Sequence, residues 1–214
     1  MPEHYIEIPK SARYSTLGEL TQDIQKVWIV CHGYGYLAHR FIRSFDKLAS
    51  QKVLIIAPEG LHRYYLNGFS GNVGASWMTK EDRLHDIKDY VTFLDAIYMK
   101  IFSDIDRSNV IVNVLGFSQG TATVCRWLCQ GKSKIDNLVL WGGPIPEDIK
   151  SHNDIELINQ LNLKLVIGNK DEFVSEENLQ EHIDYLSSLK IDYQLIRYDG
   201  THKIDATTLC SLNI

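Results

Sequence analysis

The segment from Asn109 to Cys125, NVIVNVLGFSQGTATVC, joins a run of β-branched and aliphatic residues to a run of small ones. The junction reads Gly-Phe-Ser-Gln-Gly, with the serine at position 118. One interpretation is an ordinary turn between a strand and a helix. The other is that the turn presents Ser118 as a nucleophile, which requires a strained backbone at the serine and no bulk two positions to either side. Gly116 and Gly120 meet that requirement, so the pattern favours the nucleophile.

Short runs that are almost wholly apolar recur along the chain and predict buried strands. They are apolar throughout rather than alternating, which is typical of a sheet covered on both faces. The runs are Lys26–Gly33, Lys52–Gly60, Asn109–Phe117, Asn137–Gly143, Leu163–Asn169 and Tyr193–Gly200. A weaker pattern, Tyr5–Glu19, predicts a pair of strands at one edge.

Amphipathic stretches between these runs predict helices. The longest, Glu81–Phe102, has Leu84, Ile87, Val91, Leu94 and Ile97 at helical spacing. The others are Leu37–Gln51, Gln119–Gly131 and Glu176–Lys190, the last with Leu179, Ile183 and Leu186 on one stripe. Alternating strands and helices imply right-handed crossovers and a mostly parallel sheet. We therefore expect one α/β domain over residues 1–214, with helices on both faces of the sheet and no large cap domain.

Composition limits the class of partner. The 214 residues are 44% hydrophobic and carry a formal net charge of −5, which argues against nucleic acid. No apolar run is long enough for a transmembrane helix, and the N-terminus lacks the pattern of a signal peptide. We therefore expect a cytoplasmic protein without stable membrane insertion.

The four cysteines show no spacing typical of a metal site. They are Cys31, Cys125, Cys129 and Cys210. Cys125 and Cys129 lie four residues apart on a predicted helix, where packing is commoner than ligation. We expect reduced thiols and no metal.

A serine nucleophile needs a base, and eight histidines are candidates. His85 and His182 lie in helical patterns among charged residues, which favours solvated surface positions. His202 lies just past the last predicted strand, in a short glycine-containing loop where an imidazole can reach over the strand ends. His202 is therefore the predicted base.

An acid should orient the base, and Asp171 follows the strand before the one that leads to His202. The order along the chain is then serine, acid, histidine. This is the order of such triads in folds whose nucleophile lies on a strand-to-helix turn. Asp171 would hold the imidazole tautomer and stabilise the imidazolium. Glu172 is adjacent and Asp199 is close to His202, so either of them remains an alternative acid.

The segment CHGYGY, Cys31–Tyr36, ends another predicted strand. A tetrahedral oxyanion requires two preorganised N–H donors. The backbone N–H of Gln119, at the start of the helix, is one candidate, and that of Tyr34, between two glycines, is the other. His32 is an alternative base, but its place directly before Gly33 favours a structural histidine that fixes this loop.

The segment Pro58–Lys80 predicts a long loop rich in large apolar residues, namely Tyr64, Tyr65, Leu66, Phe69, Trp77 and Met78. These side chains could anchor the loop on the core or form an apolar wall for an acyl chain. The length of the segment favours the wall, with Tyr65, Phe69, Trp77 and Met78 as pocket candidates.

Together these motifs resemble the α/β-hydrolase superfamily, and more narrowly the small carboxylesterase/phospholipase group that includes the acyl-protein thioesterases. The resemblance spans nearly the whole chain. It rests on HG-x-G at 32–35, GFSQG at 116–120, LVLWGGPIPED at 138–148, G-x-x-D-x-x-V at 168–174 and G-x-H at 200–202.

The resemblance implies a Ser118–Asp171–His202 triad, oxyanion donors at Tyr34 and Gln119, and hydrolysis of carboxylic esters or thioesters without a cofactor. The family commonly has Asp where Tyr36 stands and Pro where Ser175 stands. Both departures concern the pocket rim and bear on the identity of the substrate.

The expected function is that of a serine hydrolase, monomeric or homodimeric, that cleaves small-molecule carboxylic esters of short to medium acyl chain through an acyl-enzyme. The bulky residues of the predicted wall favour short acyl groups. The polypeptide is too short to add a lipase lid. Alternatives are an acyl thioesterase or lysophospholipase for longer chains, a serine acyltransferase, and a non-catalytic binding protein. The last would be expected to have lost a member of the triad.

Overall fold

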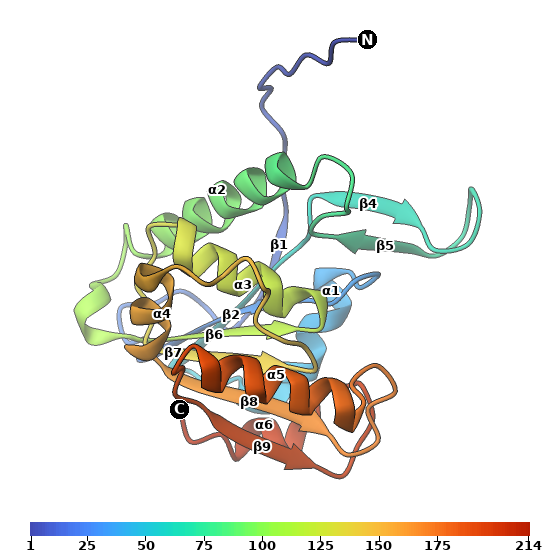
Figure 1. Cartoon of the computed structure of the whole chain (residues 1–214). Coiled ribbons are helices and arrows are strands. Elements are labelled where there is room, and N and C mark those ends of the chain that lie inside the picture. The colour runs from blue at the N-terminus through green and yellow to red at the C-terminus, as the bar shows by residue number, and fades with distance from the viewer.

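A seven-stranded sheet runs through the computed structural model, which describes residues 1–214. The strand order is β1-β3-β2-β6-β7-β8-β9, and every neighbouring pair is parallel except β1 with β3 (Figure 1). The strands are β1 (Tyr14–Leu17), β2 (Lys26–Cys31), β3 (Val53–Pro58), β6 (Ile111–Phe117), β7 (Asn137–Trp141), β8 (Asn162–Gly168) and β9 (Gln194–Tyr198). The parallel strands present their carboxyl ends at one edge, where ligands bind in sheets of this kind.

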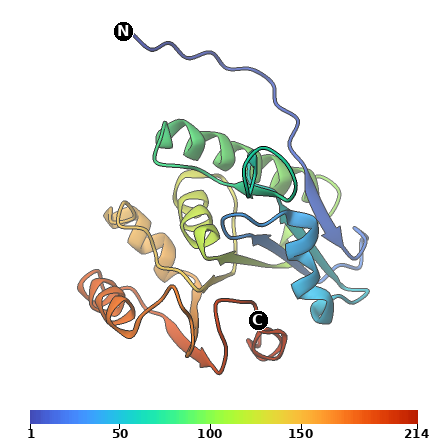
Figure 2. The same cartoon turned by 90° about the vertical axis from the view of Figure 1, so that its right-hand side faces the viewer.

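Helices cover both faces of the sheet, which gives three layers (Figure 2). One face packs against α2 (Arg83–Ile101), α3 (Gln119–Gln130), α4 (His152–Asn159) and α5 (Glu176–Ser188). The other packs against α1 (Ala38–Phe41), the 3₁₀ helix η1 (Ile42–Leu48) and α6 (Ala206–Cys210). A second short 3₁₀ helix, η2 (Arg107–Asn109), leads into β6.

The six apolar runs all form strands, which confirms the predicted mostly parallel sheet. In five of the six the central residues are buried because helices cover both faces, as the absence of alternation indicated, whereas β9 at the edge of the sheet is exposed to half-buried along most of its length. Three of the four predicted helices, Glu81–Phe102, Gln119–Gly131 and Glu176–Lys190, form α2, α3 and α5.

Three details of the prediction are wrong. The N-terminal segment contributes one strand, β1, because the residues before it are exposed and Pro9 lacks an N–H for a ladder. The predicted helix Leu37–Gln51 is divided into α1 and η1. Leu84 is exposed, because α2 begins only one residue earlier and its first turn extends beyond the core.

The segment predicted as a loop between β3 and α2 contains a β-hairpin, β4 (His62–Tyr65) with β5 (Val73–Ser76). Its tip includes Gly68 and Gly71, both with positive φ, which allows the chain to reverse direction. Figure 1 shows the hairpin projecting beyond the sheet.

Candidate active site

Ser118 stands at the junction of β6 and α3 in a strained conformation, with φ 52° and ψ −118°. The cost of such a backbone is of order 1–3 kcal/mol, and surrounding contacts must impose it. A side chain on Gly116 would collide with the Gly120 carbonyl, and one on Gly120 would collide with the Cys31 carbonyl. The Ser118 N–H donates to the Trp141 carbonyl at 2.9 Å. The two glycines therefore permit the sharp turn that the sequence predicted.

Asp171 and His202 are in direct contact at the ends of β8 and β9. Nδ1 of His202 lies 2.8 Å from Oδ2 and 3.0 Å from Oδ1 of Asp171. The two side chains are only 9% and 1% exposed. Oδ1 of Asp171 also accepts the N–H groups of Phe173 and Val174, at 2.9 and 3.2 Å. A carboxylate held in this way fixes the proton on Nδ1 and leaves Nε2 as a proton acceptor.

The two alternative acids have other partners. Glu172 accepts a hydrogen bond from the backbone N–H of His202 at 3.2 Å and has no hydrogen bond with the imidazole ring. Backbone N–H donation from Glu172 itself and from His202 lowers the pKa of the Glu172 carboxyl. Asp199 is exposed and pairs with Lys170 at 2.7 Å. The acid in contact with the imidazole is therefore Asp171.

The loop that carries His202 is held by two aromatic residues that the sequence analysis did not single out. The Tyr198 hydroxyl lies 2.7 Å from the Thr201 carbonyl and 2.6 Å from that of Lys203. Nε1 of Trp141 donates to Tyr198 Oη and to the Lys203 carbonyl, both at 3.1 Å. An aromatic residue at a strand end is ordinary core material, so the sequence offered no signal for this role.

Phe117, the residue before Ser118, and Gly142 both border the His202 ring. The Phe117 ring lies 4.8 Å from the His202 ring, and a Cβ on Gly142 would lie 2.9 Å from Cε1 of His202. Gly142 also has a positive φ of 64°, which glycine tolerates. Ser118 Oγ forms no hydrogen bond within the protein, and catalytic hydrogen bonds are often long in the unliganded state of hydrolases.

The predicted oxyanion loop lies beside the serine. A Cβ on Gly33 would lie 3.1 Å from the Ser118 Cβ. The Tyr34 N–H donates to no backbone acceptor, while the following Gly35 N–H is held by the Ala75 carbonyl of β5 at 2.9 Å. Gln119 is the first residue of α3, where backbone N–H groups lack partners within the helix. The two donor positions thus lie on segments that adjoin Ser118.

His32 is buried and has a structural role, as predicted. Its Nδ1 lies 2.7 Å from the Gly33 carbonyl, and its Nε2 accepts the Gly60 N–H at 2.9 Å. With the proton on Nδ1, the neutral ring satisfies both contacts. Burial lowers the pKa of His32 to about 4.

We expect this buried ring to make the fold acid-sensitive. Because the pKa of His32 is lower in the folded chain than the ordinary value of about 6.5, its stabilising contribution is complete above that pH. It is lost as the pH falls toward 4. The loss between pH 7 and pH 4.5 is on the order of 2 kcal/mol. Urea unfolding at the two pH values should show a smaller decline for His32→Gln, whose amide oxygen can still accept the Gly60 N–H. Equal declines in the two proteins would contradict this role.

Glu59 braces the other end of the segment that carries Tyr34, and no sequence pattern pointed to this role. Its buried carboxylate accepts Nε and Nη2 of Arg13 at 2.7 and 3.1 Å and the backbone N–H of Ala38 at 3.2 Å. Because Gly60 holds His32, two adjacent residues after β3 fasten both ends of the segment from 32 to 38. An isolated acid after a strand gives no sign of such a contact.

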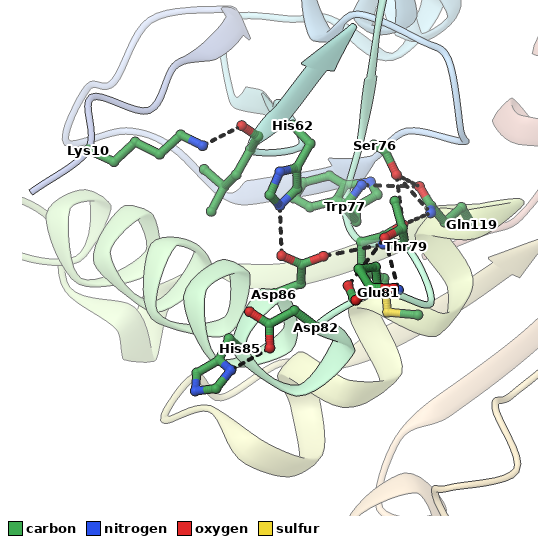
Figure 3. A network of polar contacts seen from close by, with 12 residues as sticks. Lys10, His62, Ser76, Trp77, Thr79, Glu81, Asp82, His85, Asp86 and Gln119 are labelled. Atoms are coloured by element: carbon green, nitrogen blue, oxygen red, sulfur yellow. Dashed lines mark hydrogen bonds and ion pairs between the residues drawn. The ribbon is translucent and has the colours of Figure 1, made fainter. Parts of the chain in front are cut away.

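Trp77 belongs to the core, so the expectation that its ring forms an open pocket wall is corrected. The side chain is 0% exposed, and Nε1 donates to the His32 carbonyl at 2.8 Å. The Gln119 side chain accepts the Trp77 N–H at 3.1 Å and donates to the Met78 carbonyl at 2.9 Å (Figure 3). Asp86 reinforces the same segment, because it pairs with His62 at 2.9 Å and accepts the Thr79 N–H at 3.3 Å.

The other three pocket candidates do not line the cavity between β8 and α5. Phe69 is 97% exposed at the hairpin tip, Tyr65 is exposed on β4, and Met78 packs its sulfur 3.5 Å from Nη1 of Arg126. This cavity has a volume of about 250 Å³, and its lining includes Phe173 and Val174, which follow Asp171. Ser175, where the family commonly has proline, caps α5 by accepting the Asn178 N–H at 3.1 Å.

No group of three or more His, Cys, Asp or Glu side chains gathers in a way that could hold a metal ion. The four cysteines are all free. No helix is both long and apolar enough to span a membrane.

The family model described as phospholipase/carboxylesterase matches residues 15–213. The chain belongs to this family. It is therefore an α/β-hydrolase and a carboxylic ester hydrolase, and the expected fold and reaction class are confirmed.

Solved structures resemble this family member at low sequence identity. Acyl-protein thioesterase 2 of Zea mays is 15% identical over 90% of this chain and 92% of its own, with a TM-score of 0.67. Esterase PE8 is 19% identical over 94% and 96%, also with a TM-score of 0.67. A Bacillus cereus carboxylesterase is 15% identical over 92% and 90%, with a TM-score of 0.63. At these identities the likeness concerns the fold. No curated protein matches the sequence significantly.

Proposed function

We propose that this hydrolase cleaves carboxylic esters of short to medium acyl chain through an acyl-enzyme on Ser118. The observation that carries the proposal is the buried Asp171–His202 contact, at 2.8 Å, beside a serine whose φ is 52°. A strained serine next to an oriented imidazole is the arrangement that nucleophilic catalysis requires.

In the acylation step, Nε2 of His202 takes the proton of Ser118 Oγ as the oxygen attacks the ester carbonyl carbon. The carbonyl oxygen becomes an oxyanion, which the N–H groups of Tyr34 and Gln119 would stabilise. Loss of one such donor costs roughly 2.7–4 kcal/mol in comparable sites. The tetrahedral intermediate then expels the alcohol, which takes the proton from His202 and leaves the acyl group on Ser118.

In the deacylation step, His202 takes a proton from a water molecule, and the hydroxide attacks the acyl carbon. Collapse of the second intermediate returns the proton to Ser118 and releases the acid. Asp171 stays ionised and stabilises the imidazolium in both steps. The cycle consumes only ester and water.

An acyl group bound in the cavity between β8 and α5 would be limited to short or medium length. The cavity volume of about 250 Å³ lies below the roughly 300–1,000 Å³ typical of sites for drug-sized ligands. Each methylene that fits would contribute about 0.8 kcal/mol, so kcat/KM should climb over the first carbons and then level off.

A series of p-nitrophenyl esters from acetyl to palmitoyl, with a fluorophosphonate probe of the serine, tests this function. An optimum at sixteen carbons would replace the short-chain proposal with a long-chain thioesterase or lysophospholipase. Absence of both turnover and labelling of Ser118 would favour a binding protein.

A thioesterase is the second candidate, because one structural neighbour is described as an acyl-protein thioesterase. Oxygen and sulfur esters of the same acid separate the two functions. A kcat/KM for the thioester that exceeds the value for an oxygen ester of equal leaving-group pKa would favour the thioesterase. Transfer of the acyl group to an added alcohol in preference to water would favour an acyltransferase.

Trp77→Ala should lower the free energy of unfolding without changing the chain-length profile. The ring is buried in the core and its N–H holds the His32 carbonyl, so its removal should cost about 3–5 kcal/mol. Thermal melting and the ester series, measured on wild type, Trp77→Ala and the milder Trp77→Phe, test this. A profile shifted toward longer chains with unchanged stability would restore Trp77 to the pocket wall.

A further inference from the structure

The cavity between β8 and α5 has a mostly apolar lining with two polar side chains. Leu165 and Ile167 of β8 and Leu179 of α5 form a buried floor. The other lining residues are Gly143, Pro144, Phe173, Val174, Asn178 and His182. The polar members are Asn178 and His182, both on α5.

The cavity adjoins the triad residues on two sides. A Cβ on Gly143 would lie 2.8 Å from the backbone carbonyl oxygen of Ser118. Gly143, which lines the cavity, therefore packs against the backbone of Ser118. The Phe173 ring lies 4.8 Å from the His202 ring. Phe173 is exposed and forms the rim. The cavity therefore lies next to the segments that carry Ser118 and His202.

His182 lies deeper in the cavity than Asn178. α5 starts at the carboxyl edge of the sheet and runs away from it, and the four residues between the two side chains advance about 6 Å. Asn178 is exposed and therefore lies at the rim, whereas His182 is partly buried. The cavity thus has a polar group near its inner end.

One ring nitrogen of His182 is already used, and the other is free. Nε2 accepts the Ile145 N–H at 3.4 Å, and Nδ1 has no hydrogen-bond partner in the protein. Burial lowers the pKa of His182, which favours the neutral ring. A neutral ring that accepts through Nε2 carries its proton on Nδ1, so Nδ1 is an unused donor.

We propose that the cavity binds the acyl group of the substrate and that His182 selects acyl groups with a hydrogen-bond acceptor, such as a keto oxygen, near their far end. This inference rests on the proposed function of Ser118. A water molecule in the liquid takes up about 30 Å³, and we assign the same volume to each non-hydrogen atom of the acyl group. The cavity of about 250 Å³ then holds roughly eight such atoms. The acyl group is the part of the substrate that stays bonded to Ser118, and the backbone carbonyl of Ser118 lies beside Gly143, a lining residue of the cavity.

A pair of esters of nearly equal shape tests the selection. p-Nitrophenyl 5-oxohexanoate carries the acceptor, and p-nitrophenyl 5-methylhexanoate has a methyl group in its place. We expect wild type to favour the oxo ester in kcat/KM about 3- to 10-fold, the range of a net neutral hydrogen bond. In His182→Leu the ratio should fall to one or below. In the control His85→Leu, which changes an exposed helical histidine outside the cavity, the ratio should match wild type.

The ratio separates selection from a purely structural role of His182. If the ring only holds the loop at Ile145, His182→Leu would lower both rates together and leave their ratio unchanged, which would overturn the proposal. The same two groups placed in the alcohol of acetate esters form a second arm. A preference that appears there and not in the acyl series would overturn the assignment of the cavity to the acyl group.

A binding measurement keeps the inference separate from the proposed catalysis. 5-Oxohexanamide and 5-methylhexanamide are titrated by calorimetry into Ser118→Ala with and without His182→Leu. Tighter binding of the oxo amide that depends on His182 supports the inference even if no ester is cleaved, in which case only the proposed function fails. Equal binding of the two amides, with esters cleaved normally, overturns the inference and leaves the function standing.

Discussion

Ser118→Ala is expected to reduce kcat/KM for p-nitrophenyl esters by at least about 10³-fold and to leave the fold intact. The hydroxyl is the proposed nucleophile, and no neighbouring group can replace it at the end of β6. Because Ser118 Oγ forms no hydrogen bond within the protein, its removal leaves no partner unsatisfied. Alanine meets the same backbone strain at φ 52° as serine does.

The measurement combines steady-state rates, a melting curve and labelling by a fluorophosphonate. Ser211→Ala, which changes an exposed serine near the C-terminus, is the control and should behave as wild type. Retention of a tenth of the wild-type rate by Ser118→Ala would show that another residue is the nucleophile.

Asp171→Asn is expected to lower kcat by about 10³- to 10⁴-fold with little effect on KM. The amide can donate to Nδ1 of His202, which would place the imidazole proton on Nε2 and remove the base. The side chain is 1% exposed and 2.8 Å from the ring, so solvent cannot replace the carboxylate.

Glu172→Gln is the matched control because the two acids are adjacent and both touch His202. The Glu172 carboxylate contacts His202 only through the backbone N–H of that residue. The side-chain oxygen of glutamine can accept the same hydrogen bond. We expect a change of no more than a few-fold. Comparable losses in the two variants would mean that the acids act together, and a larger loss in Glu172→Gln would assign the catalytic acid to Glu172.

The sheet was predictable because its central strands are buried on both faces, which leaves uninterrupted apolar runs such as Val27–Cys31. Short elements escaped prediction because local caps, not periodicity, define them. α4 is only eight residues long and depends on a capping box at Ser151, and α6 is five residues long and depends on Asp205. The hairpin escaped because β4 and β5 are four residues each and β4 is mostly exposed.

The residues proposed for chemistry were predictable because each follows a strand end with a glycine nearby, as Ser118, Asp171 and His202 do. The supporting contacts were not, since they join residues far apart in sequence. Glu59 reaches Ala38 across 21 positions, and Tyr198 serves the His202 loop through a hydroxyl whose partners only the fold defines. The cavity depends on the placement of α5 over β8, and nothing in the sequence marked His182 as part of it.

The attachment of His32 to Gly60 and of Ala38 to Glu59 fastens both ends of the segment Gly33–Leu37 to one dipeptide at the end of β3. Within it, Gly33 lies against Ser118, Gly35 has a φ of 81° and Leu37 is buried, so these three residues must be kept. Tyr34 and Tyr36 expose their rings, so they can be varied without loosening either fastening. New substrate preferences can therefore be sought in a combinatorial library at Tyr34 and Tyr36 that leaves the proposed oxyanion donors in register with the proposed nucleophile.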